Sequence, residues 1–260
     1  MAIAISVHGR KGMRTRNAPD GRRIPNSVSI ELSSVCNRKC PWCPQSLYQR
    51  PFGELPVELF NKIVNDLAAE DHHIPLELHF YNEPLIRYER LVESVAYARG
   101  KLPKTHISFN TNGDLLTLEK WTELRKVGLS SMKIMQYDGY EVSEPIKALQ
   151  GQIPPEDKDA FGIRMFAGRH KCNRAGLLPW KNHPLPRQRP CERTRQVCIN
   201  YLGDAVLCCC DFLGKVVIGN VANKTIMELH NDPVICHMRE ELGKGNRKDF
   251  SPCKDCDLSN

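Results

Sequence analysis

The sequence has no apolar segment near the roughly 20 residues that a membrane-spanning helix requires. Its apolar first residues, Met1 to Val7, are too short for the apolar part of a signal peptide, and no small-residue cleavage site follows them. It also has no internal repeat and no low-complexity tract. We therefore expect a cytoplasmic protein with no membrane partner and with a packed core.

Cysteine is absent between residues 44 and 171, although the chain of 260 residues contains twelve cysteines. Three of them lie between residues 36 and 43, and the other nine lie between residues 172 and 256. Cytosolic thiols are normally kept reduced, so clustered cysteines in such a protein favour metal binding over disulfides. The gap between the two groups predicts two separate metal sites.

The formal net charge is +7. Much of the excess falls early in the chain, at Arg10, Lys11, Arg14, Arg16, Arg22 and Arg23. We interpret residues 1–26 as a basic N-terminal arm that is solvated and frayed. Nucleic acid is not expected as a partner.

Strand and helix patterns alternate through the first 165 residues. The expected strands cover residues 28–32, 76–80, 106–110, 132–136 and 162–166, and the expected helices begin at Pro56, Tyr88 and Thr117. In the first helix Phe60, Ile63, Val64 and Leu67 should form one buried face. Repeated strand–helix units predict an α/β fold with a parallel sheet, open or closed only into a partial barrel.

Polar segments follow the first three expected strands. The first cysteine group follows residues 28–32, Tyr81-Asn82-Glu83 follows the second strand, and Thr111-Asn112-Gly113 follows the third. Because the carboxyl ends of parallel strands meet at one edge of a sheet, we expect these segments to converge there.

Cys36, Cys40 and Cys43 place three thiolates within eight residues. This spacing suits three corners of a [4Fe–4S] cluster and leaves one iron without a local protein ligand. A zinc site completed by a distant histidine is the alternative.

The Cys-x3-Cys-x2-Cys motif, with Trp42 before its last cysteine, resembles that of the radical S-adenosylmethionine (SAM) superfamily. The resemblance implies a partial (β/α)6-type barrel over residues 27–176 and a SAM-binding [4Fe–4S] cluster whose fourth iron binds SAM. It also implies a flavodoxin- or ferredoxin-type electron donor. Residues of the SAM pocket would be Trp42, Tyr81, Asn82, Glu83, Thr111, Asn112 and Gln136. Tyr81 and Asn82 stand where the family has two glycines.

The second cysteine group ends in Cys253-Lys-Asp-Cys256, a pair that alone suits zinc as well as iron. Residues 177–260 resemble the SPASM and twitch extensions, which hold auxiliary [4Fe–4S] clusters. The resemblance implies one auxiliary cluster with Cys191, Cys208, Cys253 and Cys256 as ligands. Cys208, Cys209 and Cys210 are consecutive, so the choice is ambiguous. Cys208 fits best because the Asp-Phe pair at 211 and 212 follows it at the family's spacing.

An auxiliary cluster with four protein ligands has no open iron and suits electron transfer. The resemblance therefore implies a dehydrogenase that oxidises a secondary alcohol of a sugar or aminocyclitol. Arg174, in Asn173-Arg174-Ala175-Gly176, resembles an arginine that reaches the active site of such enzymes.

Three other functions stay open. A radical SAM epimerase would use the thiol of Cys209 or Cys210 to return hydrogen. A peptide-modifying radical SAM enzyme would need a peptide-recognition segment, for which only the basic arm is available. A non-catalytic zinc protein that binds nucleic acid would use the arm and the C-terminal cysteines.

Overall fold

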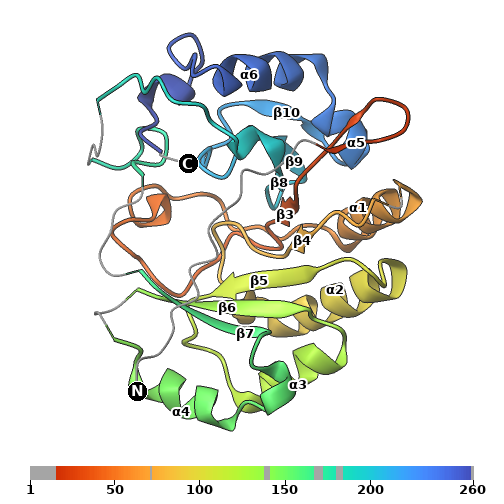
Figure 1. The fold of residues 1–260 in the computed structure, drawn as a ribbon. Coiled ribbons are helices and arrows are strands. Elements are labelled where there is room, and N and C mark those ends of the chain that lie inside the picture. The colour runs from red at the N-terminus through yellow and green to blue at the C-terminus, as the bar shows by residue number, and fades with distance from the viewer. Residues whose placement is uncertain (1–15, 71, 138–140, 167–171, 180–183, 259–260) are drawn as a thin grey trace.

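The computed structural model describes residues 16–70, 72–137, 141–166, 172–179 and 184–258. Its main sheet has eight strands in the order β10-β9-β8-β3-β4-β5-β6-β7 (Figure 1). Neighbours from β8 through β7 are parallel, whereas β9 and β10 join by antiparallel pairing. The strands are β3 (Val28–Ile30), β4 (Leu76–Glu77), β5 (Ile107–Thr111), β6 (Ser131–Gln136), β7 (Phe161–Met165), β8 (Val197–Ile199), β9 (Asp204–Val206) and β10 (Val217–Asn220).

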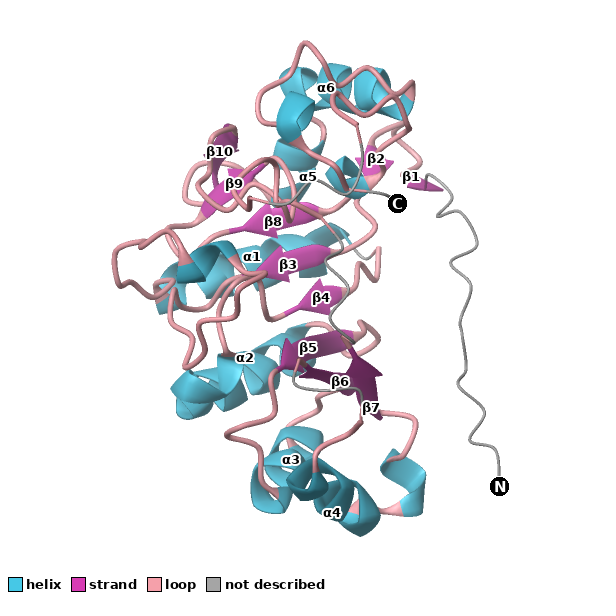
Figure 2. Cartoon of the chain, turned by 90° about the vertical axis from the view of Figure 1, so that its left-hand side faces the viewer, coloured by secondary structure: helices cyan, strands magenta, loops and turns pink. Residues whose placement is uncertain are grey.

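The helices of the first region alternate with these strands. They are α1 (Val57–Glu70), α2 (Tyr88–Lys101), α3 (Leu118–Lys126) and α4 (Glu144–Gln152). Figures 1 and 2 show α1, α2 and α3 side by side on one face of the sheet. This arrangement confirms the predicted partial α/β barrel.

Residue alternation on the strands builds the core. On β5, Ile107 and Phe109 are fully buried, whereas Ser108 and Asn110 between them are partly exposed. The buried side chains join the apolar faces of the helices, and α1 contributes the four residues predicted from its spacing. Local chemistry also sets helix ends: the Thr117 hydroxyl accepts from the N–H of Lys120 at the start of α3.

The C-terminal segment is less separate than the sequence indicated. β8 pairs in parallel with β3, and Val197, Ile199, Met227 and Leu229 belong to the same hydrophobic core as α1 and α2. Two helices, α5 (Ile226–His230) and α6 (Pro233–Gly243), complete this region. The boundary at residues 176 and 177 stays a prediction.

Part of the basic arm is folded. β1 (Arg16–Asn17) and β2 (Arg23–Ile24) form a small antiparallel hairpin, and Arg22 makes an ion pair with Glu70 at 2.9 Å. The expectation of a frayed terminus is therefore wrong for residues 16–26, because the hairpin has side-chain partners on the core. Arg10, Lys11 and Arg14 lie outside the described residues. Among the described helices, none combines the length and apolar character needed to cross a membrane.

Candidate functional site

The first cysteine group lies on the loop that leaves the carboxyl end of β3. The N–H of Cys43 donates to the Cys40 carbonyl at 2.9 Å, and the Ser46 hydroxyl donates to the Cys43 carbonyl at 2.7 Å. Cys36, Cys40 and Cys43 are in no disulfide, and all three are half-buried. The loop therefore holds them at the sheet edge where the sequence placed them.

A polar contact ties this loop to the end of β5. The Arg38 guanidinium donates to the Asp114 carboxylate through Nε at 2.6 Å, and Asn37 Nδ2 donates to the same carboxylate at 2.9 Å. Asn112 Nδ2 donates to Asn37 Oδ1 at 2.8 Å. Asp114 was missed from the sequence, although it directly follows the Thr111-Asn112-Gly113 segment and its charge is opposite to that of Arg38.

The three thiols of the first cysteine group lie on one short loop. A [4Fe–4S] cluster would bind each thiolate at a different iron. Burial raises the pKa of the Cys36 and Cys43 thiols. A bound metal would stabilise their thiolate forms.

Glu83 joins two of the predicted strand-end segments. Its buried carboxylate accepts from the Thr111 hydroxyl at 2.7 Å, from the N–H of Asn112 at 2.8 Å and from the N–H of Leu85 at 3.1 Å. Burial raises the pKa of Glu83, with these hydrogen bonds acting in the opposite direction. The arrangement gives a fixed negative group near the cysteine loop, which fits the ammonium group of SAM.

Asn82, Gln136 and Trp42 are further residues of the predicted SAM pocket, and their contacts differ. Asn82 accepts from the N–H of Phe80 at 3.1 Å, but its buried Nδ2 has no partner in the structure, so one donor is free for a ligand. The Gln136 amide oxygen accepts from the N–H of Ser143 at 2.8 Å, so this end of Gln136 orders the loop after β6. Trp42 stacks on Phe166, with ring centroids 5.0 Å apart.

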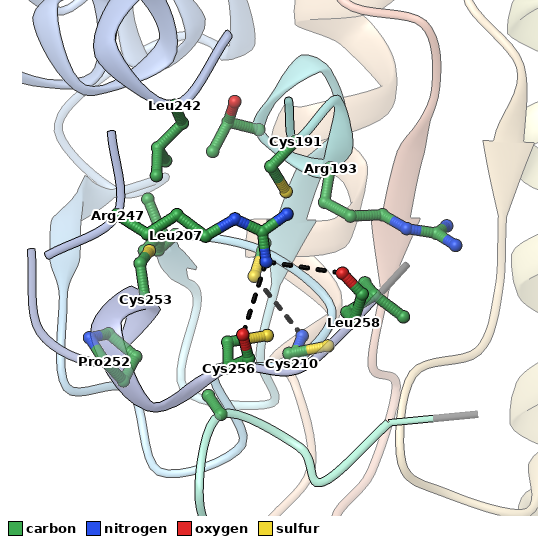
Figure 3. Close-up of a pocket in the computed structure, with 13 residues that line it drawn as sticks. Cys191, Arg193, Leu207, Cys210, Leu242, Arg247, Pro252, Cys253, Cys256 and Leu258 are labelled. Atoms are coloured by element: carbon green, nitrogen blue, oxygen red, sulfur yellow. Dashed lines mark hydrogen bonds between the residues drawn. The ribbon is translucent and has the colours of Figure 1, made fainter. Parts of the chain in front are cut away.

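The second cysteine group surrounds one pocket (Figure 3). Cys191 precedes η4 (Arg193–Arg195), Cys208 and Cys210 follow β9, and Cys253 and Cys256 belong to the η5 turn (Cys253–Asp255) and the residue after it. Burial and the neighbouring Cys208 raise the pKa of Cys191 to about 11. Burial and Cys208 also raise the pKa of Cys253. Thiols gathered around one pocket in this way can serve as ligands of a metal cluster.

Positive charge accompanies these thiols. Arg247 is 2% exposed and donates to the carbonyls of Cys256 and Leu258 at 3.3 Å, yet its Nε and Nη2 atoms are buried without a partner in the structure. Figure 3 shows its guanidinium among Cys191, Cys210 and Cys256. Arg193 lines the same pocket. An anionic cluster with four thiolates would compensate these cations, so the residues fit such a group.

The three consecutive cysteines have different surroundings. Cys208 is the one of the three whose thiol perturbs the pKa of both Cys191 and Cys253. The Cys210 sulfur lies 3.7 Å from the sulfur of Cys172, on the side of the pocket formed with Cys256. Cys209 does not line the pocket. Cys208 and Cys210 both line the pocket, so the choice of Cys208 as the fourth ligand stays a prediction.

Arg174 reaches the junction between the two cysteine groups. Its Nη1 atom donates to the Cys209 carbonyl at 3.5 Å, and its guanidinium lies 5.5 Å from the centre of the Tyr81 ring. The Tyr81 hydroxyl donates to the same carbonyl at 2.7 Å. The backbone of Arg174 is left-handed, with φ of 50°, and Asn173 anchors it through its N–H to Asp257 at 2.6 Å.

Comparisons with known proteins agree with this geometry. Residues 30–147 match the radical SAM superfamily, and residues 191–257 match an iron–sulfur cluster-binding domain, SPASM. The chain is 25% identical to the S-adenosyl-L-methionine-dependent 2-deoxy-scyllo-inosamine dehydrogenase of Niallia circulans, over 90% of this chain and 93% of that protein. It is 31% identical to the Fe-coproporphyrin III synthase of Methanosarcina barkeri, over 58% of this chain but 34% of that one.

Solved structures give the same result. A crystal structure of BtrN in complex with AdoMet and 2-DOIA matches with a TM-score of 0.82 and 26% identity, covering 90% of this chain and 94% of that one. An open conformation of BtrN matches with a TM-score of 0.70. A structure of anSMEcpe with bound AdoMet matches with a TM-score of 0.52 and 13% identity over 89% of this chain and 88% of that one, which is a likeness of fold alone.

Proposed function

Because this chain belongs to the radical SAM superfamily and carries a C-terminal SPASM iron–sulfur domain, we propose that it oxidises a secondary alcohol of a sugar, cyclitol or similar small molecule to a ketone. It is an enzyme that uses a SAM-binding [4Fe–4S] cluster, SAM and an auxiliary [4Fe–4S] cluster. Cys36, Cys40 and Cys43 are proposed to hold the first cluster, and Cys191, Cys208, Cys253 and Cys256 the second.

The observation that carries this proposal is the polar junction at the Cys209 carbonyl. Tyr81 lies two residues before Glu83 of the proposed SAM pocket, whereas Cys209 follows a proposed ligand of the auxiliary cluster. Tyr81 and Arg174 both contact that carbonyl. A substrate bound at this junction would lie between the source of the radical and an electron acceptor.

The protein residues divide the work as follows. When bound, the first cluster and SAM would supply the chemistry that removes a hydrogen atom from a substrate C–H bond, and the auxiliary cluster would supply an acceptor for one electron. Glu83, whose carboxylate is held by Thr111, Asn112 and Leu85, would hold the ammonium group of SAM. Arg174 would bind the hydroxyl oxygen, and its permanent positive charge would favour loss of the hydroxyl proton, which leaves to solvent as the ketone is released. The rings of Tyr81 and Phe212 pack together, with their centroids 4.7 Å apart. Tyr81 would exclude water from the reacting atoms of the substrate.

The test is anaerobic turnover of the reconstituted enzyme with SAM and a panel that includes 2-deoxy-scyllo-inosamine, neutral cyclitols and sugars. The reductant is a flavodoxin- or ferredoxin-type donor, which we also propose as the partner in the cytoplasm. We expect one product two mass units lighter for each 5′-deoxyadenosine formed. R174M should keep SAM cleavage and lose the ketone, whereas the exposed-site control R189M should keep both. SAM cleavage with no oxidised alcohol in the whole panel would contradict the proposal.

Return of hydrogen, as in an epimerase, is the second candidate, because the Cys209 thiol does not line the auxiliary pocket. Turnover in deuterated water separates the two functions. Solvent deuterium on carbon in the product, lost in C209S, would favour the epimerase, whereas a ketone without deuterium incorporation would exclude it.

A further inference from the structure

A second cavity, of about 340 Å³, lies at the opposite edge of the sheet from the cysteine loop. Asn26, which lines it, comes two residues before β3, and Arg195, which also lines it, comes two residues before β8. Because these strands are parallel, their amino ends share the edge away from Cys36 and Glu83. The cavity therefore has no part in the chemistry proposed above.

The walls of the cavity carry an excess of positive charge. Arg23, Arg195 and Arg239 line it, and Glu240 is the one acidic residue among the described residues that do so. Glu240 makes an ion pair with Arg23 at 3.1 Å. Arg195 pairs with Glu192 at 3.5 Å. Arg239 is buried, with 6% of its surface exposed. Among the ion pairs of the described residues, none gives Arg239 an acidic partner.

Neighbouring groups report the same imbalance. Burial, together with Arg23 and Arg195, lowers the pKa of Arg239. Burial, Arg239 and Arg23 lower the pKa of His230 to about 3, so this cavity residue is a neutral imidazole at physiological pH. It cannot add a cation or supply a counter-charge. An anion would relieve the repulsion among the three guanidinium groups.

One hydrogen-bond donor in this region has no partner in the structure, and a second makes only a weak contact. Asn26 Nδ2 is buried without a partner in the structure. Arg239 uses Nε for the Thr194 carbonyl at 3.2 Å and Nη2 for the His230 carbonyl at 2.9 Å. Among the described contacts, its Nη1 atom donates to the Cys236 sulfur at 3.7 Å. The hydrogen bonds of Nε and Nη2 therefore fix the guanidinium in place. Nη1, whose contact with sulfur is weak, can donate to a stronger acceptor.

From these contacts we propose that the cavity binds the phosphate group of a phosphorylated small molecule. Several guanidinium groups with an amide donor match a multivalent oxyanion with several acceptor oxygens. The volume exceeds that of one phosphate group, which favours a phosphate ester. Asn26 and Arg23 belong to the first region, whereas Arg195 and Arg239 belong to the C-terminal region. The ligand would therefore bridge the two regions at the edge opposite the reaction.

The first measurement is calorimetric titration of the reconstituted holoenzyme with inorganic phosphate at constant ionic strength. Wild type should bind with saturation. N26D keeps the shape of the side chain but places a carboxylate in the cavity, so phosphate affinity should fall at least about tenfold. The same change should raise the melting temperature, because the new carboxylate faces unbalanced cations. A merely structural Asn26 would lower it.

R23Q/R195Q should also lose at least about tenfold in affinity, because two of the three cations are removed. K104Q/K158Q removes the same charge from exposed positions and should leave the affinity unchanged. Iron content and circular dichroism check that each variant is folded. No saturable binding to wild type, or an equal loss in both double variants, would overturn the proposal.

A second titration compares glucose 6-phosphate, inorganic phosphate and glucose. Tighter binding of the ester than of inorganic phosphate, with no binding of glucose, supports a phosphorylated metabolite. Equal binding of the two phosphates supports a site for free phosphate. Binding of glucose that N26D leaves unchanged would overturn recognition through the phosphate group.

Discussion

Cys36, Cys40 and Cys43 lie within eight residues of one loop, whereas the cysteines of the auxiliary pocket come from segments that span residues 191 to 256. The charges around them also differ. A buried carboxylate, Glu83, lies near the first group, and a buried guanidinium, Arg247, lies within the second. One site is prepared for a cationic ligand beside its cluster, and the other is prepared to neutralise a closed, anionic cluster. The two sites have the same type of ligand, cysteine, and the opposite charges of Glu83 and Arg247 beside them suit them to different tasks.

The largest effect that this comparison predicts comes from the first loop. With Cys36, Cys40 and Cys43 changed to Ala, iron should fall from about eight to about four per chain, because one of two [4Fe–4S] clusters is lost. SAM cleavage should be abolished. Iron and sulfide analysis, with electron paramagnetic resonance after reduction, measures both. Loss of all iron would instead mean that the two sites do not load independently.

The consecutive cysteines give the next largest effect. C208A should lower iron to about four per chain while SAM cleavage continues, because the auxiliary cluster loses a ligand. C210A should keep about eight, because Cys208 is the proposed ligand among the three consecutive cysteines. C198A, at a buried strand position outside the pocket, is the matched control. The reverse pattern, with C210A losing iron and C208A keeping it, would move the ligand assignment to Cys210.

The next prediction concerns the buried carboxylate of Glu83, the negative group that lies near the first cysteine group. E83Q should weaken SAM binding about tenfold to a hundredfold, because a charge-assisted contact is lost. The raised pKa of Glu83 adds a pH signature: its carboxylate predominates above that pKa, so SAM affinity of the wild type should fall as pH decreases through it. Calorimetry across a pH series measures this dependence, which E83Q should lack. The exposed-site control E89Q should behave like the wild type.

Arg247 gives the smallest and most specific effect. R247Q removes a positive charge from the auxiliary pocket, which favours the less negative, oxidised cluster. We expect its reduction potential to become more negative, while the potential of the SAM-binding cluster stays unchanged. A redox titration followed by electron paramagnetic resonance resolves the two clusters. R189Q, which removes an exposed arginine, should shift neither; equal shifts of both clusters in R247Q would indicate a general charge effect.

Local patterns made much of this structure predictable. The spacing of Phe60, Ile63, Val64 and Leu67 identified the buried face of α1, and all four side chains are buried. The meeting of Glu83 with Thr111 and Asn112 followed from parallel topology alone. Asp232 before Pro233 is a helix-start signal that was available and overlooked, so α6 was missed.

Other features depend on contacts between distant segments. The pairing of β8 with β3 joins residues near 28 to residues near 197, and Asn173 contacts Asp257 across 84 positions. Neither pair has a local signature. The charge partner of Arg38 was hidden for the same reason, since Asp114 reaches it only after β3 and β5 take their places in the sheet.

The position of β3 also affects how the chain reaches its folded state. This strand carries the first cysteine loop at its carboxyl end, and its two neighbours are β4 and β8. A nascent chain that has emerged only as far as residue 190 contains β4 but lacks Val197–Ile199. Its apolar Val28 and Ile30 then border an unpaired strand edge, which is prone to association with other chains. Protection of this edge during synthesis, by a chaperone or by rapid translation of the remaining segment, would govern the yield of protein able to accept its clusters.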